Sequence, residues 1–411
     1  MSLPPRRAAV TFVLVTVALD MLTIGIIAPV LPKLVLQFLG GNTARTAEIY
    51  GLFGTVWALM QFFFAPVLGS LSDRFGRRPV ILLSNFGLGL DYILMAASPT
   101  LNWLFLGRVI SGITAASVPT ASAYIADVTP PEKRAGAFGL IGAAFGIGFI
   151  LGPAIGGALG SINPRLPFWA AAGFSLINAA YGFFVLPESL ARDKRMPFSW
   201  RRANPIGSLK LLRSHHELFG FATINFLGYI AHESLPSMFV LYAGYRYGWD
   251  ERAVGLSLAA VGICQAVVSA VLTRPIVSRF GERLTLLGGL TCGLAGFALM
   301  AAATSSFIFV LGIPLISFWG LAGPTSQSLM SRRVGADEQG QLQGANSSLR
   351  GISGLIGPFL FTLTFAHFID ERHRQIPGAP YWVAALLLVA ALTLALRVTR
   401  SHASATAAGA S

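Results

Sequence analysis

The chain has 411 residues, of which 54% are hydrophobic and only 11% are charged, and its mean hydropathy is +0.66. A soluble domain usually carries about a quarter charged residues, so this composition excludes a water-covered globular protein and indicates an integral membrane protein. The net charge of +13 and the isoelectric point near 10.4 suggest a nucleic acid partner at first sight, but the positions of the basic residues lead to another interpretation.

Long apolar runs divide the chain into about twelve segments, each near the roughly 20 residues that a membrane-crossing helix needs. We predict spanning helices at 8–36, 48–71, 79–97, 101–126, 136–160, 167–186, 216–243, 253–274, 284–303, 306–330, 340–366 and 380–398. The predicted fold class is therefore all-α, embedded in a lipid bilayer.

Basic residues are concentrated at the N-terminus and in the loops that follow even-numbered helices, where most of the 30 Lys and Arg lie. The loops that follow odd-numbered helices hold only Lys33, Arg45, Arg165, Arg246, Arg252, Arg372 and Arg374. Because cytoplasmic loops are enriched in Lys and Arg, this bias predicts that both termini and the even-numbered loops are cytoplasmic. The basic isoelectric point is a topology signal, and no nucleic acid partner is expected.

The first predicted helix contains an acid at membrane depth. Arg6 and Arg7 precede its apolar run as in a signal peptide, but the run continues to Leu36 without a clear cleavage site, so we expect a retained helix. Asp20 lies well inside it. An acid there costs roughly 2.5–3.5 kcal/mol unless it faces a cavity or a partner. This cost favours a proton-carrying role over a packing hydrogen bond made by a permanently neutral acid.

The loop after the second helix packs an acid and three arginines into residues 69–79, with the sequence GSLSDRFGRRP. It resembles the signature of the major facilitator superfamily in its drug/proton antiporter branch. The continuation to Leu90-Asp91-Tyr92 is similar to the tetracycline/proton antiporters, and the resemblance extends from Asp20 to about Pro358. It implies a conformational latch in this loop, formed by Gly69, Asp73, Arg74, Gly76, Arg77, Arg78 and, at the end of helix four, Asp127.

Two interpretations of this loop remain open. As a latch, Asp73 accepts backbone N–H groups at a nearby helix N-terminus, where the helix dipole favours an anion, and Arg77 or Arg78 pairs with Asp127. As an anchor, the loop is a turn held by its positive charge, which suits Arg74 and Arg78. An anchor needs no acid, so we favour the latch for Asp73, Arg77 and Asp127.

Two further charges lie inside predicted helices three and four. Asp91 matches the Leu-Asp-Tyr of the tetracycline antiporters, and Arg108 matches the superfamily motif whose arginine is tied to proton coupling. With the helix-one acid Asp20, the resemblance implies a proton-coupling set. From the residues alone, Asp91 pairs nearly as well with a neighbouring helix, and Arg108 is close enough to the start of helix four to snorkel to the interface.

Helix five carries Gly148, Gly152 and Gly156 at four-residue spacing, which lets helices approach closely. Pro153 adds a kink. Together with Gly157, the run is similar to the Gly-x-x-x-Gly-Pro-x-x-Gly-Gly antiporter signature, which separates exporters from uptake symporters.

The chain repeats itself around a basic linker. Landmarks of one half recur 205 positions later in the other, since Gly76, Gly139 and Gly152 match Gly281, Gly344 and Gly357. We predict an N-terminal six-helix bundle at 1–187, a cytoplasmic linker at 188–214, a C-terminal six-helix bundle at 215–398 and a disordered tail at 399–411. Such pseudo-symmetric halves bind substrate near the bilayer midplane in secondary transporters.

The resemblance weakens in the C-terminal half. The tetracycline antiporters carry an acid where this chain has Cys292 in helix nine, and a histidine where it has Gln265 in helix eight. Glu233 in helix seven is a further proton-coupling candidate, and the partner of Arg350 is not identifiable. Candidate substrate-binding residues are Gln61, Asn225, His232, Gln265 and Arg350. Candidate aromatic residues for an apolar drug pocket include Phe63, Phe64, Phe239 and Tyr242.

No phosphate-binding loop of the Gly-x-x-x-x-Gly-Lys type occurs, and no nucleophile or metal constellation is recognisable, so neither ATP-driven transport nor an enzyme is supported. We expect a monomeric proton-coupled antiporter of a bacterial inner membrane that exports a small amphipathic drug by alternating access, tetracycline-like compounds first. The alternatives are an exporter of other drugs or of a metabolite, and a nutrient/proton uptake symporter. No resident cofactor is expected, and a divalent metal enters only as a possible chelate with the substrate.

Overall fold

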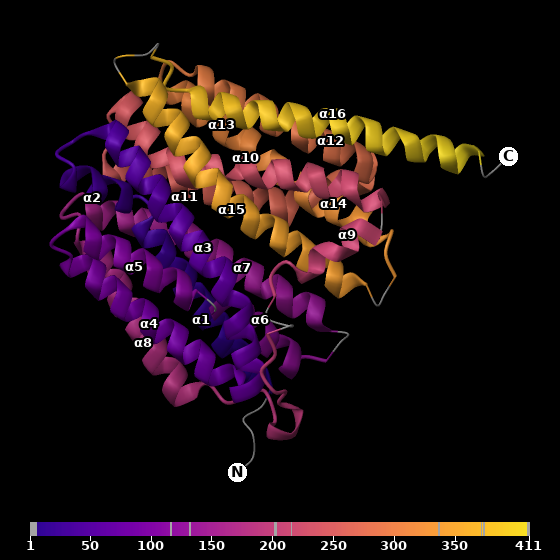
Figure 1. The fold of residues 1–411 in the computed structure, drawn as a ribbon, viewed down its shortest axis with the longest axis horizontal. Coiled ribbons are helices and arrows are strands. Elements are labelled where there is room, and N and C mark those ends of the chain that lie inside the picture. Colours follow the sequence, from indigo (N-terminus) through magenta and orange to yellow (C-terminus); the bar gives the residue numbers. More distant parts are fainter. Residues whose placement is uncertain are drawn as a thin grey trace. The chain divides into compact units, whose positions relative to one another are not determined.

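The structure is a computed structural model that describes the chain except residues 1–5, 116, 131–132, 201–203, 215, 336–337, 371, 373–374 and 409–411. Arg374, and the basic residues Arg201 and Arg202 of the predicted linker, lie outside the described residues. Over the described part of the chain, every regular element is a helix and no strand occurs (Figure 1). The predicted all-α fold class is confirmed.

The first half of the chain forms the indigo and magenta helices of Figure 1. They are α1 (Arg6–Ile27), α2 (Leu31–Phe38), α3 (Thr43–Phe75), α4 (Arg77–Ala97), α5 (Leu101–Thr114), α6 (Ser117–Val128), α7 (Arg134–Gly160) and α8 (Leu166–Val185). The linker that follows contains two 3₁₀ turns, η2 (Arg192–Lys194) and η3 (Gly207–Leu209), and the short helix α9 (Lys210–Ser214).

The second half continues the helical pattern. Its elements are α10 (His216–Tyr247), α11 (Glu251–Val267), the π-helical turn η4 (Val268–Leu272), α12 (Thr273–Ala302), α13 (Ser306–Trp319), α14 (Ala322–Ser331), α15 (Gln339–Ile369) and α16 (Ala379–Ala408).

Ten helical stretches of the described chain are long and apolar enough to cross a membrane. One of them, Glu251–Ala302, is 52 residues long and covers two predicted spans, with a break at Gly281, where φ is 74°. The 32-residue α10 is not among the ten, and its sequence includes the ionisable pair His232 and Glu233. Since a span needs about 20 residues, the protein is a multi-pass membrane protein with the predicted helix pattern.

Several predicted spans are interrupted. The first ends as α1 at Ile27 and resumes as α2, because Pro29 and Pro32 lack the N–H groups that a continuous helix needs. Helix four is divided into α5 and α6, and helix ten into α13 and α14 around Gly320. The tail expected to be disordered from 399 is instead part of α16 as far as Ala408. Its many alanines favour the helix.

The chain forms two compact units that do not follow the predicted bundles residue for residue. Unit 1 comprises 1–42, 56–204 and 249–262, and unit 2 comprises 43–55, 205–248 and 263–411. The linker is therefore divided: its first part, up to Asn204, belongs to unit 1, and the remainder belongs to unit 2.

Each unit has its own packed interior. In unit 1, α1 packs against α7 and α8, and α4 packs against α8. In unit 2, α10 packs against α15 and α16, and α12 packs against α13 and α16. Phe239 and Tyr242, candidates for a drug pocket, are instead buried core residues of unit 2, and the ring of each lies 5.4 Å from that of Phe309 in a tilted arrangement. Their apolar rings are removed from solvent because α10 is covered on these faces.

Candidate functional site

A buried acid on α1 forms the first part of the site. Asp20 is 1% exposed, and its Oδ1 accepts a hydrogen bond from Asn178 Nδ2 on α8 at 3.0 Å. The same amide donates to the backbone carbonyl of Thr16 at 3.1 Å. Asn178, which sequence reasoning missed, thereby fixes the acid against α8. The signal available in the sequence was a polar asparagine inside an apolar run.

A second buried acid lies on α4. Asp91 is fully buried, and neither of its carboxyl oxygens accepts a hydrogen bond within 3.5 Å from a described residue. The Arg108 guanidinium and the Ser111 hydroxyl of α5 act on this carboxyl group at longer range, and Arg108 Nη2 donates to Ser111 Oγ at 3.1 Å. A Cβ on Gly107 would lie 2.7 Å from Asp91 Oδ1, so glycine permits this close approach of α5.

Tyr92 joins these groups into one cluster. It is 2% exposed and interacts electrostatically with Asp20, Asp91 and Arg108. The predicted proton-coupling residues of the first half therefore lie together inside unit 1. Arg108 is half-buried beside Ser111 and Asp91. This placement favours an interaction of Arg108 with Asp91 over snorkelling of its side chain to the membrane interface.

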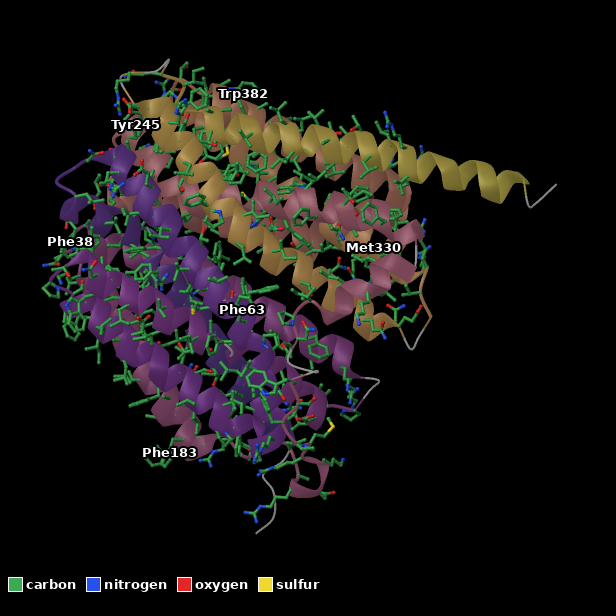
Figure 2. The ribbon with its side chains drawn as sticks, in the orientation of Figure 1. Phe38, Phe63, Phe183, Tyr245, Met330 and Trp382 are labelled. Carbon is green, nitrogen blue, oxygen red and sulfur yellow. The ribbon has the colours of Figure 1, made fainter. Side chains whose placement is uncertain are left out.

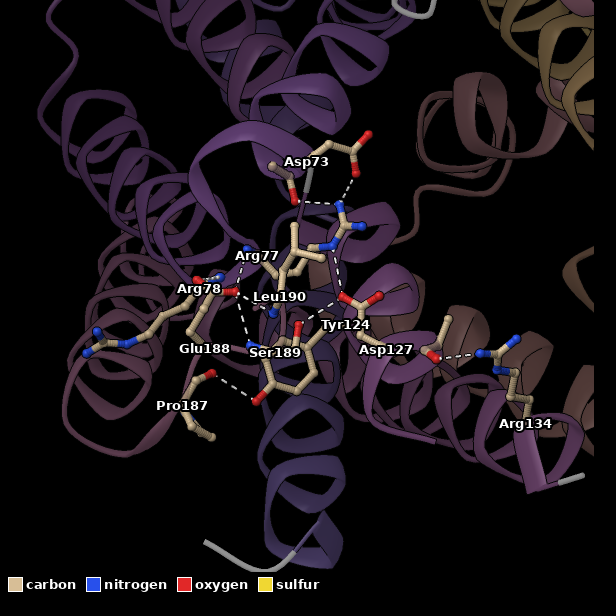
Figure 3. A network of polar contacts seen from close by, with 12 residues as sticks. Asp73, Arg77, Arg78, Tyr124, Asp127, Arg134, Pro187, Glu188, Ser189 and Leu190 are labelled. Atoms are coloured by element: carbon tan, nitrogen blue, oxygen red, sulfur yellow. Dashed lines mark hydrogen bonds and ion pairs between the residues drawn. The ribbon is translucent and has the colours of Figure 1, made fainter. Parts of the chain in front are cut away.

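The 69–78 loop is organised around a single arginine (Figure 3). Arg77 Nη1 lies 2.5 Å from Asp73 Oδ1, and Arg77 Nε lies 3.1 Å from Asp127 Oδ2. Arg77 thus links the end of α3 to the end of α6, and it is Arg77 rather than Arg78 that contacts Asp127. Ser189 Oγ donates a further hydrogen bond of 3.0 Å to Asp127 Oδ2.

Glu188 is the second residue that sequence reasoning missed. Its Oε1 accepts the backbone N–H of Arg77 at 2.8 Å, and its Oε2 accepts that of Arg78 at 3.3 Å. The carboxylate at the N-terminus of α4 is therefore Glu188 and not Asp73, which contacts the Arg77 side chain instead. The preceding Gly76 has a φ of 112°, and a Cβ there would collide with Glu188. An acid directly after helix six, at the start of a basic linker, was the available signal.

The other loop residues have separate surroundings. Arg74 is exposed and lies 5.1 Å from the Phe75 ring. Arg78 Nη2 donates to the Phe183 carbonyl on α8 at 2.5 Å, and the Phe183 side chain is labelled in Figure 2. Nothing lies within 4 Å of a Cβ placed on Gly69. Arg74 and Arg78 thus have the surroundings expected of an anchor.

The glycines of α7 face two different helices within unit 1. Cβ atoms on Gly148, Gly152 and Gly156 would each collide with the backbone of α1, and Gly25 of α1 packs in return on Pro153. Gly157 instead contacts the start of α11. The motif therefore lets three helix backbones approach closely, because each contact lacks a side chain.

A polar cluster in unit 2 centres on Arg350 of α15. Its guanidinium lies 5.6 Å from the Tyr229 ring and interacts electrostatically with His232 and Glu233 of α10. This supplies the partner of Arg350 that the sequence left unidentified. The His232 ring lies 6.1 Å from that of Trp319. The Glu233 side chain packs on Gly357 of α15.

The remaining candidate residues are not gathered in one place. Asn225 Nδ2 lies 3.4 Å from Met330 Sδ, labelled in Figure 2, and 3.4 Å from Asn346 Oδ1, so it links α10 to α14 and α15. Gln265 Nε2 donates to Ser269 Oγ at 3.3 Å on its own helical run. Gln61 is half-buried on α3.

Aromatic residues of α3 line a separate pocket in unit 1. Its volume is about 430 Å³, and it is lined by Phe63, Phe64, Val67, Trp200 and Asn204. Its lining is mostly apolar, and two of the lining residues, Trp200 and Asn204, belong to the linker.

Residues 13–358 match the model of the Major Facilitator Superfamily. The chain belongs to this superfamily. This match confirms the resemblance seen in the 69–79 loop. Members of the superfamily are membrane transporters of small molecules and not enzymes.

Curated relatives cover most of the chain. Tetracycline resistance protein class C of Escherichia coli is 38% identical over 87% of this chain and 90% of its own length. The class D protein of Salmonella ordonez is 37% identical over 90% and 91% of the two chains, and the class B protein of Escherichia coli is 35% identical over 91% and 93%.

Solved structures show the same fold. The human organic anion transporter MFSD10 superposes with a TM-score of 0.71 over 96% of this chain and 100% of that chain, at 24% identity. The nucleoside transporter NupG has a TM-score of 0.75 over 95% and 98%, at 14% identity. The major-facilitator-type fold is therefore established.

Proposed function

We propose that this protein is a proton-coupled antiporter that exports tetracycline-like compounds by alternating access. The observation that carries the proposal is the cluster of Asp20, Asp91 and Arg108 around the buried Tyr92 in unit 1. Relatives that are 37% and 38% identical over most of the chain, and whose names are tetracycline resistance proteins, support the choice of substrate.

The cluster has the chemistry that proton coupling needs. A buried carboxylate requires a counter-charge or a proton, because burying an isolated charge is costly. The positive charge of Arg108 balances the negative charge of an ionised Asp91, and protonation of Asp91 leaves Arg108 without this counter-charge. Binding and release of one proton therefore change the charge balance between α4 and α5. Asn178 holds the second acid, Asp20, in a fixed orientation.

The loop around Arg77 is proposed to act as the latch of the cycle. Arg77 binds acids of α3 and α6, while Glu188 holds the first amides of α4. These contacts stabilise one conformation, and they are proposed to open in the other. The bias of Lys and Arg among the loops supports a cytoplasmic position for the latch and for both termini. We further propose that the protein is a monomer in a bacterial inner membrane, that the proton is its coupling ion and that it has no resident cofactor.

A second candidate function is the export of other drugs or of a metabolite. It is favoured by the absence of an acid at position 292, where this chain has Cys292, and by Gln265 in place of a histidine. If the substrate is a chelate of a hard divalent cation, which carboxylate oxygens suit, Cys292 offers it a poorer ligand than the acid of the tetracycline antiporters does. In unit 2, Arg350 is a charged candidate for substrate contact, and Glu233 is the candidate for proton coupling.

Drug tolerance of cells that express the chain tests the proposal. We expect tetracycline tolerance to rise, to return to baseline with a proton uncoupler, and to be lost in Asp91→Asn and Asp20→Asn at unchanged protein level. Asp193→Asn in the exposed turn η2 is the matched control and is expected to behave as the parent. Tolerance that survives the uncoupler would overturn proton coupling. Unchanged tetracycline tolerance with raised tolerance to other drugs would favour the second candidate.

A further inference from the structure

Four buried polar side chains of unit 1 carry atoms that the site described above does not use. Asn85 on α4 is 1% exposed, and neither its Nδ2 nor its Oδ1 has a hydrogen-bond partner among the described residues. Within the same part of the chain, the buried hydroxyls of Thr120 on α6 and Ser175 on α8 also have none. Asn178 Nδ2 donates to Asp20, but Asn178 Oδ1 accepts no hydrogen bond from a described residue. Because burying an unsatisfied polar group is costly, these atoms indicate an internal ligand.

Asn85 and Thr120 lie opposite each other where α4 packs on α6. The ion pair of the latch joins the start of α4 to the end of α6, so the two helices run antiparallel from it. One turn further in, Ile81 and Tyr124 belong to one buried cluster. Asn85 and Thr120 each follow four residues beyond these, which is about one more turn, or about 6 Å. The Asn85 amide and the Thr120 hydroxyl therefore lie at the same level of unit 1.

Two glycine contacts fix how α4 lies along α8. A Cβ on Gly89 would collide with Leu176, and a Cβ on Gly182 would collide with Leu82. The two helices are therefore antiparallel, and Asn85 lies between the two contacts. It shares their face of α4, because residues three and four apart are neighbours on a helix surface.

Asn178 is the polar residue of α8 at this level, since it lies between the two contact residues of that helix. Its Oδ1 therefore belongs with the polar atoms of Asn85 and Thr120, and Ser175 adds a hydroxyl one turn away. All four groups are neutral and able to accept hydrogen bonds, which suits water rather than an ion. A buried water molecule typically makes about three hydrogen bonds to otherwise unsatisfied groups, and this cluster supplies that number beside Asp20.

Apolar side chains lie between this cluster and the loop end of unit 1. Ile81 is one turn nearer to the loop than Asn85, and Tyr124 is one turn nearer than Thr120. Both pack in a buried cluster with Val13 of α1. In the conformation described here, the polar groups are therefore enclosed within the bundle.

We propose that Asn85 and Thr120, together with the Oδ1 atom of Asn178, bind water inside unit 1, and that this water exchanges protons with Asp20. The proposal rests on the proposed transport function. The O–H bond of the Asp20 carboxyl group breaks as an O–H bond forms to the water oxygen, and the proton leaves through further water molecules when the apolar cluster parts. Asn85 and Thr120 are positioning residues, because they hold the water and do not themselves gain or lose a proton.

Hydroxyl-radical footprinting of the full-length protein in lipid nanodiscs measures the bound water without any substrate. In water enriched in oxygen-18, X-ray radiolysis of a bound water molecule labels the side chains next to it, even where they are buried. The reporter is Leu88, which is 4% exposed and lies three residues from Asn85. The variants are Asn85→Leu, Thr120→Val and the conservative Thr120→Ser. Asn102→Leu, at an exposed asparagine of α5, is the matched control.

We expect Leu88 to be labelled in the parent, and its labelling to fall by about fivefold in Asn85→Leu and Thr120→Val, the equivalent of one hydrogen bond. Uptake of tetracycline into inverted vesicles under a pH gradient should slow by a similar factor. The melting temperature should not fall in Thr120→Val, because the substitution keeps the shape of the side chain and removes a buried polar group. Thr120→Ser and the control are expected to behave as the parent in labelling and uptake.

Three results would overturn the proposal: no label on Leu88 in the parent, unchanged labelling in Thr120→Val, or lost labelling with parental uptake. Thr120→Val decides the test if Asn85→Leu does not fold. If the parent transports no drug, the proposed function fails. The water site is then supported only if labelling falls in Thr120→Val and is kept in Thr120→Ser, and any other labelling result refutes it.

Discussion

Asn178 on α8 donates a hydrogen bond of 3.0 Å to the Asp20 carboxylate on α1, and both side chains are buried. The amide is itself held by the Thr16 carbonyl at 3.1 Å. One uncharged residue therefore orients an acid that the proposed mechanism requires to carry a proton.

We expect Asn178→Ala to reduce transport while the membrane level of the protein is kept. A hydrogen bond to a charged group contributes about 1.5–3 kcal/mol, so drug uptake into inverted vesicles driven by a pH gradient should fall by about tenfold or more. Asn102→Ala on the exposed face of α5 is the control. Equal uptake rates in the two variants would show that Asp20 does not depend on this donor.

Neutralising Arg108 alone should destabilise the protein. Removal of one partner of a buried charge pair costs up to about 3–5 kcal/mol, and less here because Arg108 is half-buried. We expect Arg108→Gln to lower the melting temperature in detergent, and the double variant D91N/R108Q to regain most of the loss while remaining inactive in proton exchange. Arg45→Gln, in an exposed ion pair, should change stability by less than about 0.5 kcal/mol. A double variant less stable than Arg108→Gln would contradict the pairing.

The glycines of α7 give a matched pair of alanine substitutions. A Cβ on Gly156 would collide with the Ile26 carbonyl of α1, whereas nothing lies within 4 Å of a Cβ on Gly146. Overpacking costs about 1–3 kcal/mol, so Gly156→Ala should lower the melting temperature. Gly146→Ala should leave it unchanged or raise it, since an unstrained Gly→Ala change contributes about 0.4–1 kcal/mol. Thermal unfolding followed by tryptophan fluorescence distinguishes the two, and equal losses would refute close packing at Gly156.

Glu188 should be needed to keep the first turn of α4 closed. Loss of a capping acceptor costs about 0.5–2 kcal/mol, so Glu188→Ala should raise hydrogen exchange at Arg77 and Arg78. Glu188→Gln, which keeps an acceptor oxygen, should have a smaller effect. Asp193→Asn, an exposed acid of the same linker, should have none. Exchange that is the same in all three would mean that the cap is not supplied by Glu188.

The helices could be predicted well because each membrane-crossing helix is encoded by one continuous apolar stretch of sequence. The sequence also singled out Asp20 and Asp91, two acids that the structure buries inside helices. It favoured Arg77 as the latch residue but did not derive its contact with Asp127, since adjacent residues on a helix point about 100° apart and the contact depends on how α4 is rotated against α6.

Contacts between helices distant in the chain were the main omission. Asn178 and Glu188 each act on residues more than a hundred positions earlier, and neither position carries a motif. Arg350 and Glu233 were both singled out, but their proximity depends on the register of α10 against α15. Interruptions at Pro29 and Gly320 were missed because hydropathy does not report the loss of backbone hydrogen bonds.

The division of the linker bears on how the protein can be separated into fragments. Glu188 caps α4, and the Met196 amide donates to the Asp73 carbonyl at 3.1 Å, so the segment up to Asn204 is structurally part of unit 1. A polypeptide cut at 187 would lose the acceptor for its third transmembrane helix and expose that helix end. For co-expression of two complementary fragments, the cleavage point therefore belongs after Asn204, where the first fragment retains its own cap.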